Sequence, residues 1–238
     1  MTAGASHIRS FVPRRGRMTP TQSDALSRLA DRYVLPMPAG TLDLAAAFSA
    51  RMPVVLDVGF GLGEATAAMA AAEPTTAVLA VEVHTPGIGQ LLHLVERGGI
   101  TNVRILQADA IDILDHHLPP ASLAGIRIWF PDPWPKVRHH KRRLVRVDVI
   151  ELLVDRLADG GVLHLATDWR HYALQMRDLL DACPQLASRA VEPGGFVRRP
   201  DWRPETRFER FAAIKGHSVH DLLYERVRRH PVPDGDDA

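Results

Sequence analysis

The sequence predicts an α/β domain built on a doubly wound and mostly parallel β-sheet. Short apolar runs without polar alternation, such as P-V-V-L-D-V-G at residues 53–59, recur between segments that carry apolar residues at helical spacing. Runs of this kind are typical of strands that are buried on both faces of a parallel sheet. Because strands and helices alternate at short spacing, we expect right-handed crossovers between consecutive strands.

The predicted elements follow one another along the chain. Strands are expected at residues 53–59, 78–83, 103–107, 126–130 and 162–166, and a last strand at residues 219–226 completes the sheet. Helices are expected at residues 21–33, 63–72, 88–96, 109–116, 145–157 and 172–181. Pro74 ends the second of these helices, and the pair Gly160 and Gly161 ends the fifth.

Length and composition favour one globular domain with tails, because 46% of the 238 residues are apolar and 24% are charged. We expect a flexible basic arm at residues 1–20, a single domain at residues 21–230 and a flexible acidic tail at residues 231–238. Cys183 is the single cysteine and no secretory leader is recognisable, which favours a cytoplasmic location. No apolar run approaches the roughly 20 residues that span a bilayer, so no membrane association is expected.

Positive charge is concentrated in two parts of the chain, although the formal net charge is only +1. Residues 136–146 contain six Lys or Arg residues and residues 1–17 contain four Arg residues, without an acid in either segment. Each run alone is compatible with a solvated surface. Together with the neighbouring chemistry, they favour a polyanionic partner.

An acidic residue closes or follows each of the five expected parallel strands. These residues are Asp57, Glu82, Asp109, Asp132 and Asp168. In a doubly wound sheet, ligands bind outside the carboxyl ends of the strands. We therefore expect the five carboxylates to converge in one crevice.

The turn after the first strand reads D-V-G-F-G-L-G-E, with glycines at positions 59, 61 and 63. A dinucleotide-binding fingerprint has its last glycine where this chain has Glu64, so a nicotinamide cofactor is disfavoured. A glycine loop that follows an acid suits a ligand with a positive group and no phosphate. S-adenosylmethionine, which carries a sulfonium and an ammonium, is such a ligand.

Two of the acids stand at offsets that suit this ligand. Glu82 is placed to accept hydrogen bonds from the ribose hydroxyls, and Asp109 is placed near the amine of the adenine. A metal is not expected, because the adjacent histidines at residues 116–117 and 139–140 lack a third ligand at a suitable spacing.

The stretch F-P-D-P-W-P-K-V-R-H-H-K-R-R-L at residues 130–144 resembles the signature of the bacterial tRNA (guanine-N7-)-methyltransferases. Further matching segments are R-S-F-V-P-R-R-G-R-M-T at 9–19, V-E-V-H-T-P-G at 81–87, A-T-D-W at 166–169 and R-P-E-T-R-F-E-R at 203–210. The resemblance covers nearly the whole chain. It implies a Rossmann-like class I S-adenosylmethionine-dependent methyltransferase fold with an antiparallel strand near the C-terminus.

The resemblance also implies site residues and an activity. The implied cofactor-binding residues are Asp57, Gly59, Gly61, Gly63, Glu82, Asp109 and Asp132, and the last of these is also the catalytic residue. The implied substrate-binding residues are Lys136, Asp168, Thr206, Arg207, Phe208 and Glu209. The implied reaction transfers the methyl group of S-adenosylmethionine to N7 of guanine 46 in the variable loop of tRNA, without an obligatory protein partner.

The chemistry of this reaction agrees with the residues. Guanine N7 has an available lone pair and loses no proton on methylation, so the reaction needs alignment and negative potential rather than a general base. Asp132, held between two prolines, is the expected source of that potential, with Asp168 as a second contact to the base. Trp134 or Phe130 is expected to stack on the guanine, because a base must leave its stack to be reached.

The cations are expected to contact RNA phosphates. They are Arg138, Lys141, Arg142 and Arg143, together with the N-terminal arm and Arg198, Arg199, Arg203 and Arg207.

Three alternative functions remain at this point. A methyltransferase acting on an exocyclic base nitrogen more typically has an acid or amide followed by two prolines and an aromatic residue after the fourth strand. A nicotinamide-dependent dehydrogenase is disfavoured by Glu64. The third alternative is a non-catalytic RNA-binding protein that retains the cofactor fold.

Overall fold

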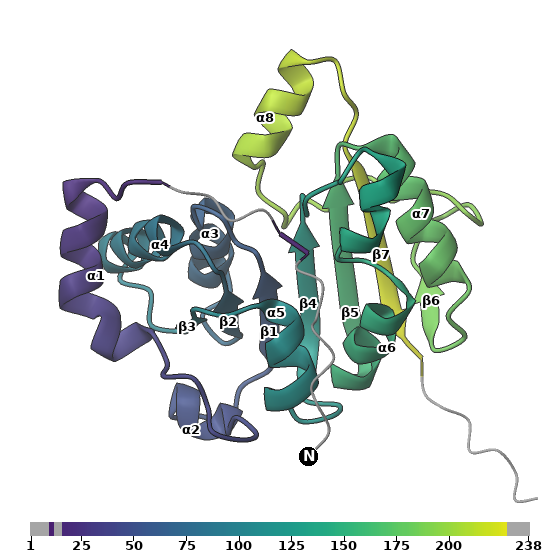
Figure 1. Ribbon diagram of the computed structural model, residues 1–238. Coiled ribbons are helices and arrows are strands. Elements are labelled where there is room, and N and C mark those ends of the chain that lie inside the picture. Colours follow the sequence, from purple (N-terminus) through teal and green to yellow (C-terminus); the bar gives the residue numbers. More distant parts are fainter. Residues whose placement is uncertain (1–9, 12–15, 228–238) are drawn as a thin grey trace, which may run out of the picture.

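The computed structural model describes residues 10–11 and 16–227, and its centre is a seven-stranded sheet in the order β3-β2-β1-β4-β5-β7-β6 (Figure 1). The strands are β1 Val54–Val58, β2 Ala77–Val81, β3 Val103–Leu106, β4 Leu123–Trp129, β5 Leu157–Thr167, β6 Leu186–Ser188 and β7 His220–Arg226. Strands β1 to β5 pair in parallel, and β7 is antiparallel to both β5 and β6. The expected mostly parallel sheet with an antiparallel C-terminal strand is confirmed.

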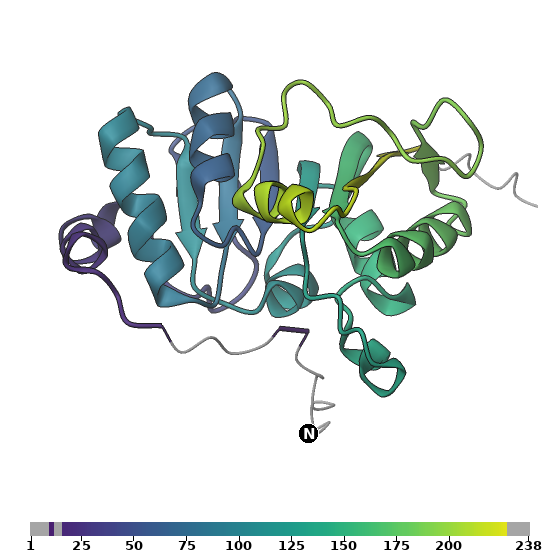
Figure 2. The ribbon, with the colours of Figure 1, turned by 90° about the horizontal axis from the view of Figure 1, so that it is seen from above.

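Helices cover both faces of the sheet. Figure 2 shows α3 Glu64–Ala72 and α4 Thr85–Gly98 on one face, and α1 Pro20–Tyr33 packs against α4. The opposite face carries α5 Ala110–Asp112, which continues as the π-helix η1 Ile113–His117, together with α6 Val147–Arg156 and α7 Arg170–Asp181. Each face has its own apolar core. The alternate residues of β2 contribute to the two cores, which is why this strand reads as an unbroken apolar run.

The strand order places the ligand-binding edge. Strands β2 and β3 lie on one side of β1, whereas β4 lies on the other side, so the order reverses between β1 and β4. Ligands of doubly wound sheets bind at such a switch point, outside the carboxyl ends of the strands. Figure 1 shows a further helix, α8 Arg207–Ile214, above this edge.

Four elements are absent from the sequence-based prediction. They are α2 Leu44–Phe48, the 3-10 helix η2 Val137–Arg142, β6 Leu186–Ser188 and α8 Arg207–Ile214. All four are short, so apolar periodicity gives little signal for them. The start of α8 does have a signal, because Thr206 and Glu209 form a capping box.

The strand β5 also differs from the prediction, since it begins at Leu157 rather than at residue 162. Leu157 already pairs with Leu123 of β4, and the register then shifts so that Val162 pairs with Gly125. The glycines at 160 and 161 therefore lie within an irregular part of the strand instead of separating it from a helix. They still follow the end of α6, which is at Arg156.

The expected arm is described only at residues 10–11 and 16–20, and the expected tail at residues 231–238 lies outside the described residues. Within the described part of the chain, no helix is both long and apolar enough to cross a membrane.

Candidate active site

A pocket of about 260 Å³ opens at the carboxyl ends of the central strands. Its described lining residues come from the segment before α1, the ends of β1, β2 and β4, the loops after β1 to β4, the start of α5, and α8. They are Ser10, Phe11, Val58, Gly59, Gly61, Val81, Glu82, Val83, His84, Ala108, Asp109, Ala110, Ile128, Trp129, Phe130, Pro131, Asp132, Leu144 and Phe208. Three carboxylates belong to this lining, and no Lys or Arg does among the described residues. The pocket therefore suits a ligand with positive charge.

The glycine loop after β1 forms one wall of the pocket. Gly59, Gly61 and Gly63 all have positive φ angles, of 69°, 63° and 74°, which residues with a side chain rarely adopt. The loop also approaches α4 closely, because a Cβ atom on Gly87 would lie 2.1 Å from the carbonyl oxygen of Gly61. Gly63 precedes α3 and does not line the pocket. The glycines are thus required by backbone conformation and by a backbone-to-backbone contact.

Glu82, which follows β2, is held by backbone donors. Its Oε2 accepts from the backbone N–H of Gly61 at 2.9 Å, and its Oε1 accepts from those of Val83 and His84 at 2.7 and 3.0 Å. A carboxylate offers about four lone-pair sites, so Oε2 retains acceptor capacity for a hydroxyl of a ligand. The three donors orient a carboxylate that lines the pocket.

Asp109 is held by the helix that follows it. Its side chain caps α5 by accepting a hydrogen bond from the backbone N–H of Ile111 at 3.0 Å. The residue also lines the pocket. A capping carboxylate has a restricted side-chain position, so Asp109 presents a preorganised acceptor at the end of β3.

Asp57 lies beneath the glycine loop and is not part of the pocket lining. The residue is 4% exposed, and it accepts a hydrogen bond from Oγ1 of Thr66 in α3 at 2.7 Å. Burial raises the pKa of Asp57, while the charge of Arg127 and the hydrogen bond from Thr66 act in the opposite direction. The structure therefore gives Asp57 a role in joining β1 to α3 under the loop, in place of the expected lining position.

The loop after β4 has unusual backbone geometry. Phe130 and Trp134 both have positive φ angles, of 53° and 43°, although neither is glycine. Such conformations cost on the order of 1–3 kcal/mol each and persist only where the surroundings enforce them. Asp132 lies between them, flanked by two prolines, and lines the pocket with Phe130. The carboxylate is therefore presented by a segment whose backbone has little freedom.

Arg143 supports this loop from within the protein. The side chain is buried, with 0% exposure, and its Nε donates to the carbonyl oxygen of Pro133 at 2.9 Å. Its guanidinium carbon lies 4.7 Å from the ring centroid of Tyr172, and Nη1 donates to Gln175. The expectation that Arg143 contacts the RNA backbone is wrong for this structure, because a fully buried guanidinium does not reach an external phosphate.

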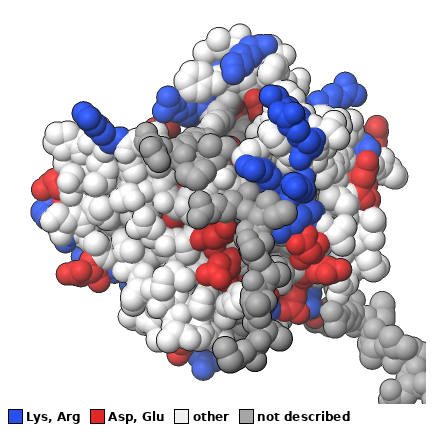
Figure 3. All heavy atoms as spheres, in the orientation of Figure 1, with Lys and Arg blue, Asp and Glu red and all other residues white. Residues whose placement is uncertain are grey.

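The other expected RNA-backbone cations lie at the surface. Arg138, Lys141 and Arg142 of η2 are exposed, as is Lys136 immediately before it. The guanidinium of Arg142 lies 5.0 Å from the ring centroid of Trp134, so this cation is next to the loop that carries Asp132. Figure 3 shows a group of Lys and Arg side chains to the right of centre, directly above a group of acidic side chains.

The segment at residues 206–209 approaches the pocket through one side chain only. Phe208 stacks on Phe130 with ring centroids 5.5 Å apart and an interplanar angle of 17°. Thr206 caps α8, and Arg207 points over the ring of Phe211 at 5.1 Å. Glu209 is buried and completes the capping box. Of the four expected substrate residues in this segment, Phe208 is the one that lines the pocket.

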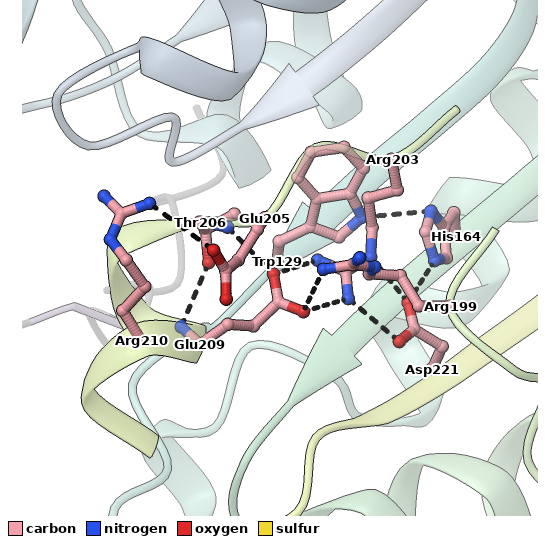
Figure 4. A network of polar contacts seen from close by, with 9 residues as sticks. All are labelled: Trp129, His164, Arg199, Arg203, Glu205, Thr206, Glu209, Arg210 and Asp221. Atoms are coloured by element: carbon pink, nitrogen blue, oxygen red, sulfur yellow. Dashed lines mark hydrogen bonds and ion pairs between the residues drawn. The ribbon is translucent and has the colours of Figure 1, made fainter. Parts of the chain in front are cut away.

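Glu209 pairs with a second buried arginine, as Figure 4 shows. Arg203 is 1% exposed, and its two terminal nitrogens donate to the carboxylate of Glu209 at 2.6 and 2.8 Å. Burial alone would raise the pKa of Glu209, but the hydrogen bonds from Arg203 and from the backbone of Thr206, together with the charges of Arg203 and Arg199, lower it. The expectation that Arg203 contacts phosphates is therefore wrong, whereas Arg198, Arg199 and Arg207 are exposed.

The structure brings together only part of the expected site. The expected residues that line the pocket are Gly59, Gly61, Glu82, Asp109, Asp132 and Phe208. Those that do not are Asp57, Gly63, Lys136, Asp168, Thr206, Arg207 and Glu209. Asp168 follows β5 and lies 3.7 Å from Nδ1 of His217. Among the described residues, no three His, Cys, Asp or Glu side chains are arranged to hold a metal ion.

Sequence reasoning missed two buried polar residues near the pocket, His164 of β5 and Asp221 of β7. They are 1% and 2% exposed, and they share a 2.8 Å hydrogen bond although 57 residues separate them in the sequence. Their only local signal is a polar residue inside an apolar strand. Such a residue predicts a buried partner without identifying it.

Comparison with known proteins gives a consistent result. The profile of a family described as "Putative methyltransferase" matches residues 51–222. The chain is 52% identical over 222 residues to a tRNA (guanine-N(7)-)-methyltransferase of Streptomyces avermitilis, which covers 93% of this chain and 76% of the relative. It is 48% identical over 224 residues to a protein of the same name from Bordetella pertussis, which covers 94% of this chain and 87% of the relative.

Solved structures show the same fold at low sequence identity. The crystal structure of the 16S rRNA methyltransferase KamB matches with a TM-score of 0.57 and 15% identity, covering 82% of this chain and 99% of that chain. The aminoglycoside resistance methyltransferase NpmB1 matches with a TM-score of 0.52 and 17% identity, covering 77% and 92%. These two likenesses bear on the fold alone. By its sequence relatives and the matching family profile, the chain belongs to the family of S-adenosylmethionine-dependent tRNA (guanine-N(7)-)-methyltransferases.

Proposed function

We propose that the chain methylates N7 of guanine 46, in the variable loop of tRNA, and so produces 7-methylguanosine. The observation that carries this proposal is the position of Asp132, which lines a carboxylate-rich pocket at the switch point of the sheet. The names of the relatives support tRNA as the substrate class and guanine N7 as the methylated atom. The proposed reaction takes place in the cytoplasm and requires neither a metal nor a second protein.

The pocket residues fit S-adenosylmethionine. Glu82 accepts a hydrogen bond from a ribose hydroxyl, Asp109 accepts one from the adenine amine, and the positive φ angles at Gly59 and Gly61 allow the loop to approach the ligand. Asp57 and Gly63 support this loop from behind without lining the pocket. When bound, the cofactor supplies a methyl group on a positively charged sulfur. The absence of Lys and Arg from the described pocket lining suits that charge.

Asp132 stabilises positive charge where the methyl group moves. The lone pair of guanine N7 would form the new bond to the methyl carbon as that carbon's bond to sulfur breaks, which would leave a neutral thioether. No proton leaves, so no general base is required. The purine ring gains positive charge as the methyl group arrives, and a carboxylate held in place lowers the energy of that state. The proline-bounded loop and the Arg143 hydrogen bond beneath it hold Asp132 in position before the substrate binds.

The proposed substrate contacts divide between the base and the backbone. The stacked pair Phe130 and Phe208 offers an aromatic edge to a guanine that has left its stack. Asp168, Lys136 and the exposed Arg207 lie outside the pocket lining and serve the nucleotides around the guanine. Thr206 and Glu209 act indirectly, since they cap the helix that carries Phe208.

The exposed cations of η2 position the RNA. Arg138, Lys141 and Arg142 contact phosphates, a type of contact that sets the orientation of the RNA and reads no sequence. Recognition of the tRNA then depends on its folded shape.

The experiment is methylation of two tRNA transcripts that differ only at position 46. The purified chain is incubated with labelled S-adenosylmethionine and a transcript with guanine or adenine at that position, and the nucleosides are then analysed. We expect labelled 7-methylguanosine from the first transcript only. Absence of 7-methylguanosine from both would refute the function, and equal amounts from both would refute position 46.

A further inference from the structure

A chain of buried polar contacts connects the helix α8 to the pocket. Its members are Glu209, Arg203, Asp221, His164 and Trp129, and we call it the buried network (Figure 4). The five residues come from α8, the loop before it, β7, β5 and β4. Both ends reach the pocket, because Trp129 lines it directly and Glu209 caps the helix that carries Phe208.

Arg203 occupies the centre of the network between two carboxylates. It donates to both oxygens of Glu209, and its Nη2 donates to Oδ2 of Asp221 at 3.0 Å. Its Nε lies 2.8 Å from Oδ1 of Asp221. The planar guanidinium makes a two-pronged hydrogen bond to Glu209 at fixed angles, which lysine does not reproduce. The position of α8 relative to β7 is therefore set by one rigid cation.

The other half of the network fixes the protonation of His164. The indole Nε1 of Trp129 is 3.1 Å from Nδ1 of His164 and has only a hydrogen to offer, so Nδ1 must be the acceptor. The proton of a neutral imidazole is then on Nε2, which donates to Oδ1 of Asp221 at 2.8 Å. Each hydrogen-bonding atom of this ring has one defined partner. The contact pattern thus specifies a single orientation of the ring.

The same residues also contact one another through their rings. The guanidinium of Arg203 lies 5.6 Å from the ring centroid of Trp129, and the His164 ring lies edge-on to the same indole at 5.3 Å. Trp129 immediately precedes Phe130, whose ring stacks on Phe208 of α8. The loop that carries Asp132 and the helix that carries Phe208 therefore meet twice, once through the network and once in the pocket.

We propose that His164, Asp221 and Arg203 are positioning residues that hold α8 and the loop after β4 in the arrangement needed for methyl transfer to RNA. This inference rests on the proposed function, since it assigns α8 to the substrate side of the pocket. None of the three lines the pocket, so they act through Glu209, Phe208 and Trp129 rather than on the reacting atoms.

The Glu209 carboxylate is also stabilised by contacts other than those with Arg203. It stands in the first turn of α8, where the partial positive charge of a helix N-terminus stabilises a carboxylate. Arg199 adds a longer contact, with Nη1 3.6 Å from Oε1 of Glu209. The two acids of the network are thus compensated by Arg203, Arg199 and the helix end, while His164 remains neutral.

The test is the variant Asp221→Asn, which keeps the size of the side chain and removes its charge. We expect kcat/KM for tRNA to fall by about 10- to 100-fold, because displacement of an aligning element by about 1 Å costs that much. The Kd for S-adenosylmethionine should change less than about three-fold, since Glu82 and Asp109 follow other strands, β2 and β3. Amide hydrogen exchange at residues 207–214 should accelerate without substrate, while exchange in α4 stays unchanged.

A matched control separates positioning from simple loss of stability. Tyr224→Phe removes a 2.5 Å hydrogen bond to Asp181 from a buried residue of the same strand, β7, but does not touch the network. It should lower the melting temperature and leave kcat/KM unchanged. Trp129→Phe removes the hydrogen bond to His164 and should produce smaller effects of the same kind as Asp221→Asn. This variant replaces Asp221→Asn in the test if Asp221→Asn does not fold.

Two results would overturn the proposal. One is a kcat/KM for Asp221→Asn within two-fold of the unmodified chain at equal folded fraction, and the other is unchanged amide exchange in α8. If the unmodified chain forms no 7-methylguanosine, the proposed function is refuted independently of the network. The exchange measurement then still decides whether the network holds α8.

Discussion

Arg143 donates a 2.9 Å hydrogen bond from Nε to the carbonyl oxygen of Pro133, the residue that follows Asp132. Arg142 is its neighbour in the sequence, yet it is exposed and lies over the ring of Trp134. Adjacent cations in one basic run therefore face opposite environments. One supports the loop that carries the pocket carboxylate, and the other is available to an external anion.

The two arginines should respond differently to substitution. Arg143→Met removes the hydrogen bond to Pro133, and hydrogen bonds that involve a charged group contribute about 1.5–3 kcal/mol. We expect urea denaturation to show a loss of about 2 kcal/mol in the free energy of unfolding. Methyl transfer should fall at least about ten-fold, because Asp132 is no longer held in line. The salt dependence of tRNA binding should stay as it is.

Arg142→Ala serves as the matched variant. The free energy of unfolding should stay within about 0.5 kcal/mol, as is usual for a surface position. The slope of log K for tRNA against log salt concentration should become shallower by about one unit, because one phosphate contact is lost. A larger decrease in the free energy of unfolding for Arg142→Ala than for Arg143→Met would contradict the assignment of Arg143 to the interior and Arg142 to the surface.

Asp132→Asn should separate catalysis from binding. The amide keeps the shape of the side chain but lacks the charge that stabilises the methylated ring, so kcat should fall by about 10²- to 10³-fold. The Kd for tRNA, measured by filter binding, should change less than about three-fold. Asp168→Asn should act mainly on the KM for tRNA, because Asp168 lies outside the pocket lining. A larger loss of kcat from Asp168→Asn than from Asp132→Asn would contradict this assignment and would make Asp168 the catalytic residue.

Glu82→Gln should weaken the binding of the cofactor. The amide has one acceptor oxygen, whereas the carboxylate accepts three backbone N–H groups and retains capacity for a ligand. We expect calorimetry to show a 10- to 100-fold increase in the Kd for S-adenosylmethionine, which corresponds to about 1.4–2.8 kcal/mol. Glu64→Gln is the control, since its carboxylate is half-exposed at the start of α3 and lies outside the pocket lining. An equal effect of the two variants would argue against the ribose contact.

His164 should make stability depend on pH. Burial lowers the pKa of His164 below its ordinary value of 6.5, and the charges of Arg203 and Arg127 act in the same direction while Asp221 opposes them. Between the lowered pKa and 6.5 the unfolded chain binds more protons than the folded chain, so stability falls as the pH falls through this window.

The comparison with His164→Gln isolates this effect from the other histidines. Relative to the variant, the unmodified chain should lose up to about 1.4 kcal/mol of unfolding free energy per pH unit below 6.5. Urea denaturation at pH 7.5, 6.5 and 5.5 measures the difference. Parallel curves for the two proteins would mean that His164 is not held neutral in the folded state.

Several features of the site were predictable because their causes are local. The glycines at 59, 61 and 63 predict a turn with positive φ angles, and the acids at 82 and 109 follow apolar runs that are recognisable as strands. The prolines around Asp132 predict a loop with a restricted backbone. Each of these signals depends on residues within a few positions of one another.

Other features were not predictable from local signals. Arg142 and Arg143 have the same chemistry and adjacent positions, and only the packing of α7 and its Tyr172 against the loop buries one of them. Asp57 stands at the end of β1 as expected, but Thr66 and Arg127 draw its carboxylate beneath the glycine loop. The direction of a side chain at a strand end depends on partners that the local sequence does not contain.

The sequence by itself determined the class of sheet, the edge at which ligands bind and the placement of Glu82, Asp109 and Asp132 at that edge. It could do so because strand periodicity and turn chemistry act over short distances along the chain. The tertiary structure alone decided which charged side chains face the pocket, which face solvent and which pair in the buried network. His164 and Asp221 show the physical reason, since the hydrogen bond between them joins residues 57 positions apart, and burial makes each of them require the other.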